Sequence, residues 1–150
     1  MKECIVVIDP LESQSQTFYP VVSTLFRDHA HHLKCSLVVQ HSSKEIRTVD
    51  RAIITVRTLY SEAAALAFWK KIMDAPHSSI EWESLLSPHQ EPQAFLELYA
   101  SPRIELLVTH DRAKARSMGA NITPSVVKID QAGHMICLKG QQPLEVILAP

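Results

Sequence analysis

Cysteine, glycine and long apolar runs are scarce in this chain, and each scarcity excludes a class of protein. Its 150 residues include three glycines and three cysteines, which stand far apart at Cys4, Cys35 and Cys137. An odd number of widely spaced cysteines predicts neither a disulfide framework nor a metal site. We interpret the three cysteines as small buried residues of strands. The sequence has no glycine-rich phosphate loop, no G-x-S-x-G and no H-E-x-x-H. We therefore predict no cofactor and no metal.

Charge and hydrophobicity are those of an ordinary globular protein. The apolar fraction is 46%, the charged fraction is 21% and the net charge is -1. Without a basic excess, neither nucleic acid nor an acidic membrane is expected as a partner. No apolar run approaches the roughly 18 residues that span a bilayer. No secretory signal is visible, which predicts a cytoplasmic protein as written, or a periplasmic one if the chain is a trimmed mature form.

Two short apolar runs around an amphipathic segment predict a β-α-β unit. Residues 4–8 form a continuous β-branched run, which is typical of a strand buried on both faces. Ser13 and Gln16 have the spacing of a capping box, so a helix is expected to begin there. That helix should fade near residues 32–34, and a second apolar strand should follow at 35–40.

The middle of the chain is expected to be helical. Alanines and a stripe of large apolar residues predict one continuous helix over about 53–74. After a loop with Pro76 and His77, a second helical patch is expected around residues 80–86. Pro92 is placed to open another short helix.

The last third has the clearest boundaries. A helix is predicted from Pro102 to a left-handed cap at Gly119. Residues 125–129 and 134–138 are expected to pair as a hairpin around a tight turn. Pro143 should open a final helix.

These elements predict an α/β fold with a mixed central sheet flanked by helices. A right-handed β-α-β unit makes the first two strands parallel, and the hairpin adds an antiparallel edge. A helical insertion at about 50–118 separates the β-α-β half from the β-β-α half. We expect a single domain over residues 1–150.

One segment carries a specific resemblance. Residues 118–127, MGANITPSVV, resemble the "lGv.gTPtvv" segment of the thioredoxin-like superfamily, and residues 6–11, VVIDPL, resemble the "vFtDp.C.yC" segment of the bacterial disulfide isomerases C and G. The resemblance covers nearly the whole chain and implies a thioredoxin-like fold. It also implies that Pro124 is a cis proline, and that Ile122, Thr123 and Pro124 offer an exposed backbone edge to an extended peptide. Alternatively, Pro124 merely starts a strand.

The chain departs from this family at the redox site. Where the family has Cys-x-x-Cys, this chain has Glu12, Ser13, Gln14 and Ser15. Thiol-disulfide exchange needs an attacking thiolate and a resolving thiol, and a hydroxyl without an adjacent base is a far weaker nucleophile. Ser13 and Ser15 are interpreted as helix caps, and Glu12 as a charge suited to the positive end of the helix dipole. We therefore predict that dithiol catalysis is lost and that the protein is not an enzyme.

Two further clusters are interpreted as surface features. His29, His31 and His32 have no carboxylate or cysteine at ligand spacing, so they are expected to form a solvated helix end. Glu81 and Glu83 lie two residues apart and do not face each other on a helix.

The resulting hypothesis is a redox-inactive thioredoxin-like module that binds a protein partner. Its docking groove would lie between residues 12–15 and 122–124. The resemblance suggests an accessory role in a bacterial secretion, conjugation or envelope system. Two alternatives stay open: a thiol-disulfide oxidoreductase or isomerase relative working through Cys4, Cys35 or Cys137, and a structural homodimer.

Overall fold

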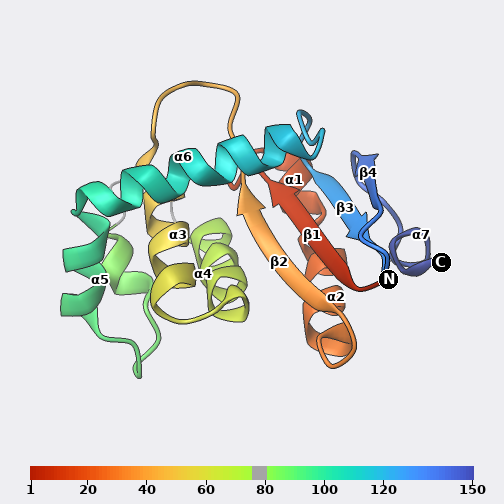
Figure 1. Ribbon diagram of the computed structural model, residues 1–150. Helices are drawn as coiled ribbons and strands as arrows, with labels where there is room; N and C mark the ends of the chain where they lie inside the picture. The colour runs from red at the N-terminus through yellow and green to blue at the C-terminus, as the bar shows by residue number, and fades with distance from the viewer. Residues whose placement is uncertain (76–80) are drawn as a thin grey trace. The chain divides into compact units, whose positions relative to one another are not determined.

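The computed structural model describes all residues except 76–80 and divides the chain into two compact units (Figure 1). The sheet unit comprises Met1–Ser42 and Asp111–Pro150, and the helical unit comprises Ser43–His110. The loop predicted at Pro76 and His77, and the start of the helical patch predicted at Ile80, lie outside the described residues.

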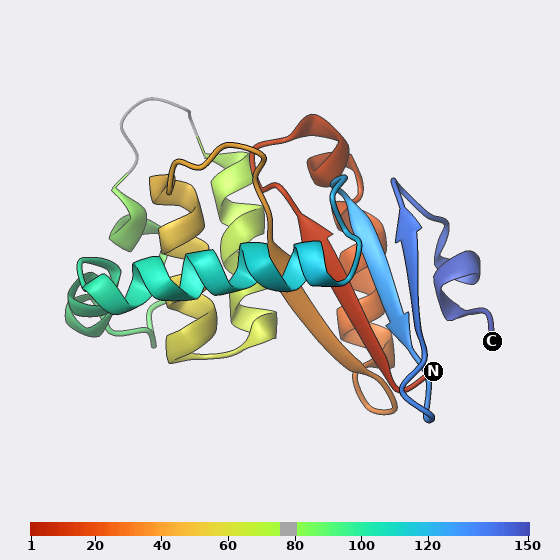
Figure 2. The ribbon, with the colours of Figure 1, turned by 45° about the horizontal axis from the view of Figure 1, so that its top comes forward.

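The sheet unit is built on four strands, β1 (Glu3–Ile8), β2 (Lys34–Val39), β3 (Ser125–Ile129) and β4 (Met135–Lys139). They lie in the order β2-β1-β3-β4 (Figure 2). β1 pairs in parallel with β2, whereas β1 with β3 and β3 with β4 are antiparallel. The predicted mixed sheet is therefore confirmed. Residues 4–8 of β1, which lies between β2 and β3, are buried.

Helices cover both faces of this sheet. The sheet unit contains α1 (Ser13–Thr17), α2 (Tyr19–His29), α7 (Leu144–Leu148) and the C-terminal part of α6 (Pro102–Ser117). α2 lies on one face and the end of α6 crosses the other. On the α6 side, apolar side chains of β1 and β3 pack with two alanines around the end of the helix. These are Ile5, Val7, Val127, Ala115 and Ala120.

The helical unit contains α3 (Thr48–Leu59), α4 (Glu62–Asp74), the 3-10 turn η1 (Trp82–Leu85), α5 (Pro92–Tyr99) and the first part of α6. Its core is aromatic. The Phe95 ring is 1% exposed, with its centroid 6.2 Å from that of Phe68 and 5.6 Å from that of Tyr99. The Arg51 guanidinium lies 5.4 Å from the Tyr99 ring centroid.

The continuous helix predicted over 53–74 is wrong, because two helices meet there. α3 ends at Leu59, and Tyr60 adopts a non-helical backbone with φ -124° and ψ -82°. Ser61 then caps α4, since its Oγ accepts a hydrogen bond of 3.0 Å from the amide of Ala64. The apolar stripe continues across this break, which is why periodicity alone predicted one helix.

The first helix is also divided, at Phe18, into α1 and α2. Pro20 lies in the first turn of α2. Backbone N–H groups in a first turn have no intrahelical acceptor, so the N–H that proline lacks costs the helix no hydrogen bond. α2 ends at His29, a little earlier than predicted. Among the described residues, no helix is both long enough and apolar enough to cross a membrane.

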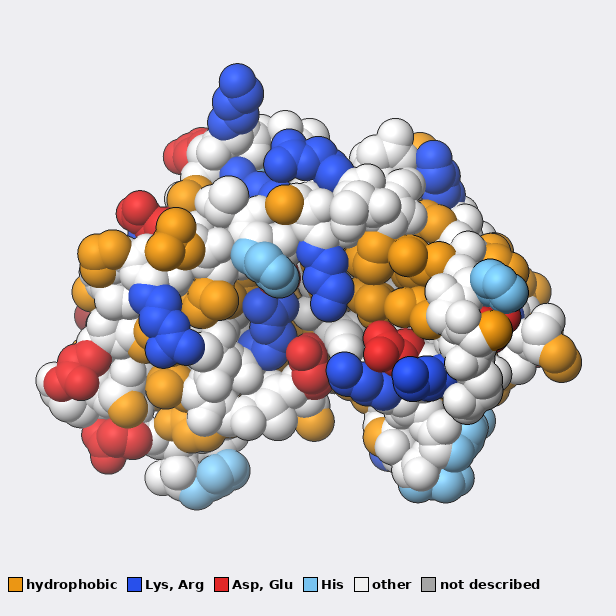
Figure 3. All heavy atoms as spheres, in the orientation of Figure 1, with side chains coloured by type: hydrophobic (Ala, Val, Ile, Leu, Met, Phe, Trp, Pro, Cys, Tyr) orange, Lys and Arg blue, Asp and Glu red, His pale blue; other side chains and the backbone are white. Residues whose placement is uncertain are grey.

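Three histidines at the C-terminal end of α2 form a cluster on the surface of the sheet unit, where pale-blue side chains gather in Figure 3. His31 Nε2 lies 3.0 Å from His32 Nδ1, and the His29 and His32 ring centroids are 5.3 Å apart. His31 and His32 are exposed, as predicted for a solvated helix end, whereas His29 is partly buried and its Nδ1 has no access to solvent.

We expect His32 to titrate below the usual value of 6.5, because partial desolvation, followed by the charges of His31 and His29, lowers its pKa. The folded state then binds this proton more weakly than the unfolded state, so stability falls as the pH drops below about 6.5. NMR titration of the imidazoles would measure this, and His31→Ala should raise the His32 pKa. His134→Ala is the control, and a His32 pKa at or above 6.5 would contradict the expectation.

Candidate functional site

A polar cavity of about 370 Å³ lies in the sheet unit, where three loops meet. One loop follows β1, one follows β2 and the third precedes β3. The carboxyl ends of the parallel strands β1 and β2 meet at one edge, which brings the first two loops together. The cavity is lined by Asp9, Glu12, Ser13, Gln14, Gln40, Ser42, Asn121, Ile122 and Thr123.

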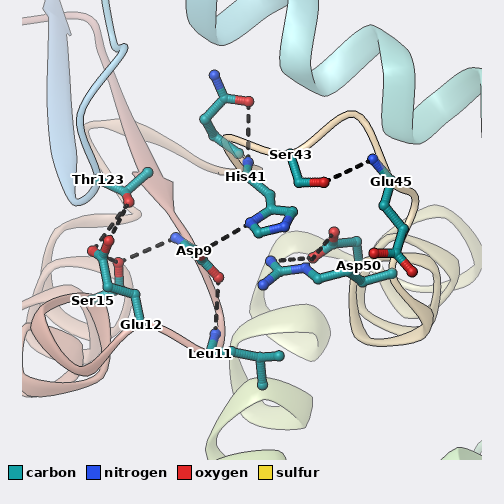
Figure 4. A network of polar contacts seen from close by, with 11 residues as sticks. Asp9, Leu11, Glu12, Ser15, His41, Ser43, Glu45, Asp50 and Thr123 are labelled. Atoms are coloured by element: carbon teal, nitrogen blue, oxygen red, sulfur yellow. Dashed lines mark hydrogen bonds and ion pairs between the residues drawn. The ribbon is translucent and has the colours of Figure 1, made fainter.

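The Glu12 carboxylate joins the first loop to the third (Figure 4). Thr123 Oγ1 lies 3.1 Å from both carboxylate oxygens and donates to them, although the two residues are 111 positions apart. Ser15 Oγ donates to Glu12 Oε1 at 3.2 Å. Glu12 is the N-cap residue of α1, so its negative charge lies at the positive end of that helix.

Ser15 is fully buried and has a structural role. Its Oγ accepts a hydrogen bond of 3.1 Å from the amide of Asp9 while donating to Glu12. This bond ties the end of β1 to the first turn of α1. Because the hydroxyl has no access to solvent and is engaged in both directions, Ser15 cannot act as a nucleophile toward a substrate.

The predicted capping roles of Ser13 and Ser15 are wrong. Ser13 is the first residue of α1 and Glu12 is the N-cap, without a side-chain capping bond. The Gln16 side chain donates to the carbonyl of Pro10 at 3.0 Å, so no capping box forms. The loop is instead closed by hydrogen bonds that converge on Asp9, whose backbone carbonyl accepts from the Glu12 amide at 3.1 Å.

His41 follows β2 and faces Asp9 across the ends of the two strands (Figure 4). His41 Nδ1 lies 3.4 Å from Asp9 Oδ2 and makes no hydrogen bond of ordinary geometry with a described residue. The contact is therefore an ion pair that forms when the imidazole is protonated. Both side chains are largely buried, at 19% and 15% exposed.

Thr123 offers unpaired backbone groups beside the cavity. The Thr123–Pro124 peptide bond is cis, the conformation that the resemblance implies. The Ile122 carbonyl accepts from Ser125 Oγ, and the Pro124 carbonyl accepts from the Gly140 amide at 2.8 Å. Between them, the Thr123 N–H and C=O make no hydrogen bond within the described part of the chain. One donor and one acceptor are thus left for solvent or a ligand.

Most of the residues predicted for the groove meet at this cavity. Glu12, Ser13, Gln14, Ile122 and Thr123 line it, whereas Ser15 and Pro124 are buried and do not. Whether this cavity binds a partner stays a prediction.

Sequence reasoning missed the residues that the strand ends contribute, namely Asp9, Gln40, His41 and Ser42, and also Asn121. A usable signal was present. Residues that directly follow two adjacent parallel strands come to the same edge of the sheet. The polar residues after the two predicted strands could have been assigned to one site on that ground.

The three thiols lie away from this cavity, on the strands. Cys4 is fully buried, and desolvation raises its pKa to about 12. Burial also raises the pKa of the half-buried Cys35. Cys137 is half-buried on β4, and all three cysteines are free thiols. Among the described residues, no group of three or more histidine, cysteine, aspartate or glutamate side chains could hold a metal ion.

The chain has the thioredoxin-like fold of Dsb-type proteins. It superposes on a Nitrosomonas europaea protein proposed to be a protein disulfide isomerase with a TM-score of 0.79 at 11% identity, covering 98% of this chain and 94% of that one. For DsbA2 of Pseudomonas aeruginosa the TM-score is 0.72 at 16% identity, with coverage of 98% and 85%. For the cytosolic disulfide reductase DsbM of the same organism the TM-score is 0.66 at 11% identity, with coverage of 91% and 89%.

No protein-family model and no curated protein matches the sequence. The prediction that the protein is not an enzyme is contradicted by the structural comparisons. The proteins that share its fold are named as disulfide isomerases and reductases, which are enzyme classes. That prediction rested on the missing Cys-x-x-Cys at residues 12–15 and on the lack of another catalytic motif, but three thiols remain in the chain.

Proposed function

We propose that this chain is a Dsb-type protein that binds an extended polypeptide segment of a protein partner at the cavity between residues 12–15 and 122–124. The unpaired backbone N–H and C=O of Thr123 carry the proposal, because an extended peptide satisfies such a pair by adding itself as a strand. The Ile122 side chain, 50% exposed at the rim, supplies an apolar contact.

The chemistry of the cavity suits a polypeptide backbone. Its lining consists mainly of amide, hydroxyl and carboxylate groups, which hydrogen-bond peptide N–H and C=O groups. Glu12 keeps the two walls of the cavity at a fixed separation through Thr123, so the peptide-binding edge is preorganised. We propose that the protein is an accessory component of a bacterial secretion, conjugation or envelope system, and that its partner is another component of that system. Co-purification from the native organism tests this.

Titration of the isotope-labelled protein with a reduced, carbamidomethylated protein, used as a permanently extended probe, tests the groove. We expect the largest changes in amide chemical shift at residues 121–123. Ile122→Ala should weaken binding about five- to tenfold, since it removes a partly buried apolar side chain from the contact.

Ile136→Ala is the matched control, because Ile136 is 59% exposed and is not among the residues that line this cavity. Equal weakening by both variants, or shift changes confined to other segments, would show that the extended probe does not use this groove.

A second candidate function is thiol-disulfide exchange through one cysteine, and the shared fold of the disulfide isomerases and reductases favours it. Cys137 is the best placed of the three, because it is half-buried on β4 and burial suppresses the thiolates of Cys4 and Cys35. Alkylation kinetics decide it. Fast modification of Cys137 at pH 7, abolished by Cys137→Ser, would support exchange, and uniform resistance of all three thiols would reject it.

A further inference from the structure

Two of the three cysteines lie side by side at the end of the sheet away from the cavity. β1 and β2 are parallel neighbours, and Cys4 and Cys35 are partners in their register. Side chains of register partners project from the same face of a sheet. Neighbouring strands are about 4.7–4.9 Å apart, within the Cα separations of about 4.4–6.8 Å that disulfides accept.

The surroundings of the pair differ from one sulfur to the other. Cys4 is fully buried, and the neighbouring Cys35 thiol is the second cause of its raised pKa, after desolvation. Cys35 Sγ lies 3.9 Å from the carbonyl of Leu25 in α2 and 3.7 Å from that of Leu33. Cys35 is half-buried, so reagents reach it first.

We propose that Cys4 and Cys35 form a cross-strand disulfide and are a site of reversible oxidation by low-molecular-weight disulfides. The Cys35 thiolate attacks the small disulfide, forming a mixed disulfide and releasing one thiolate. The Cys4 thiolate then attacks Cys35 Sγ, which closes the Cys4–Cys35 bond and releases the second thiolate. The protons of the two protein thiols pass to the two released thiolates, so two protein thiols are oxidised and one small disulfide is reduced.

Burial makes this reaction slow and steeply dependent on pH. Both thiols have raised pKa values, about 12 for Cys4, so few thiolates exist at pH 7. While the pH is below the pKa of a thiol, its thiolate becomes about tenfold more abundant for each unit by which the pH rises. The finished bond is reduced slowly, because attack on the half-buried Cys35 sulfur must expel the Cys4 thiolate, which is a poor leaving group owing to its raised pKa. The site therefore suits a long-lived oxidised form, independent of peptide binding at the cavity.

Incubation of the intact chain with glutathione disulfide at pH 7.0 and at pH 8.5 tests the proposal. We expect the loss of two of the three thiols, a mass about 2 Da lower and a peptide map that joins Cys4 to Cys35. The rate should rise at least tenfold between the two pH values.

Cys137→Ser should form the same link, whereas Cys4→Ala should stop at a glutathione adduct on Cys35. Circular dichroism would check that Cys4→Ala is folded. The peptide map of the unaltered chain tests the proposal even if that variant does not fold. The proposal is overturned if Cys4 stays reduced while Cys35 or Cys137 accumulates glutathione, or if only intermolecular links form.

Discussion

The double variant E12C/S15C will form a disulfide between positions 12 and 15 and gain thiol-disulfide exchange activity at a site that contains no thiol in this chain. Glu12 is the N-cap of α1, and Ser15 lies buried in the first turn beside it. The positive end of a helix stabilises a thiolate, so the thiol introduced at position 12 should have a pKa well below ~8.5. The thiol at position 15 is placed to resolve a mixed disulfide.

The gain should be large, because the exchange rate rises from background by an order of magnitude or more once an acidic thiol and its resolving partner are present. Insulin reduction in the presence of dithiothreitol measures the activity, and a peptide map locates the link. The matched control is S13C/S15C, which adds the same number of thiols. Positions two apart on a helix do not face each other, so that pair should not close.

Failure of E12C/S15C to form the link would show that residues 12–15 do not have the geometry of the family's dithiol, despite the shared fold. Closure without activity would have a different meaning. It would place the obstacle in the surroundings, where Thr123 Oγ1 is placed to donate to a carboxylate and Asp9 lies at the end of β1.

The strands and the mixed character of the sheet could be predicted from the sequence, because each strand is short, apolar and bounded by a clear stop. Residues 125–129, for example, were predicted with the bounds that β3 has. The division of the long middle helix could not be predicted in the same way. In the sequence, Ser61 cannot be distinguished from a serine on the solvent face of one long helix. Only the structure shows that its Oγ accepts a hydrogen bond from the Ala64 amide and so caps a new helix.

Site residues that belong to a local sequence motif could be predicted. Contacts between residues far apart in the sequence could not. Thr123 and the loop at residues 12–15 were found by resemblance. The bond between Glu12 and Thr123 spans 111 positions, and no local pattern encodes it. The contact between Asp9 and His41 depends on two strands ending at the same edge, which follows from the topology but was not used.

Phe95→Ala will destabilise the protein by about 3–5 kcal/mol, because it empties the centre of the aromatic core of the helical unit. The Phe95 ring is 1% exposed and contacts the rings of Phe68 and Tyr99. Leu96→Ala is the control on the same helix: Leu96 is 40% exposed, so its truncation should change stability by only about 0.5 kcal/mol.

The same variant tests the prediction that residues 1–150 form one domain. Both tryptophans, Trp69 and Trp82, are in the helical unit, and all three cysteines are in the sheet unit. Tryptophan fluorescence and thiol accessibility during urea unfolding therefore report on the two units separately. A single cooperative domain requires that both transitions coincide and that Phe95→Ala moves them together. A shift of the fluorescence transition alone would divide the chain into two independently folding parts.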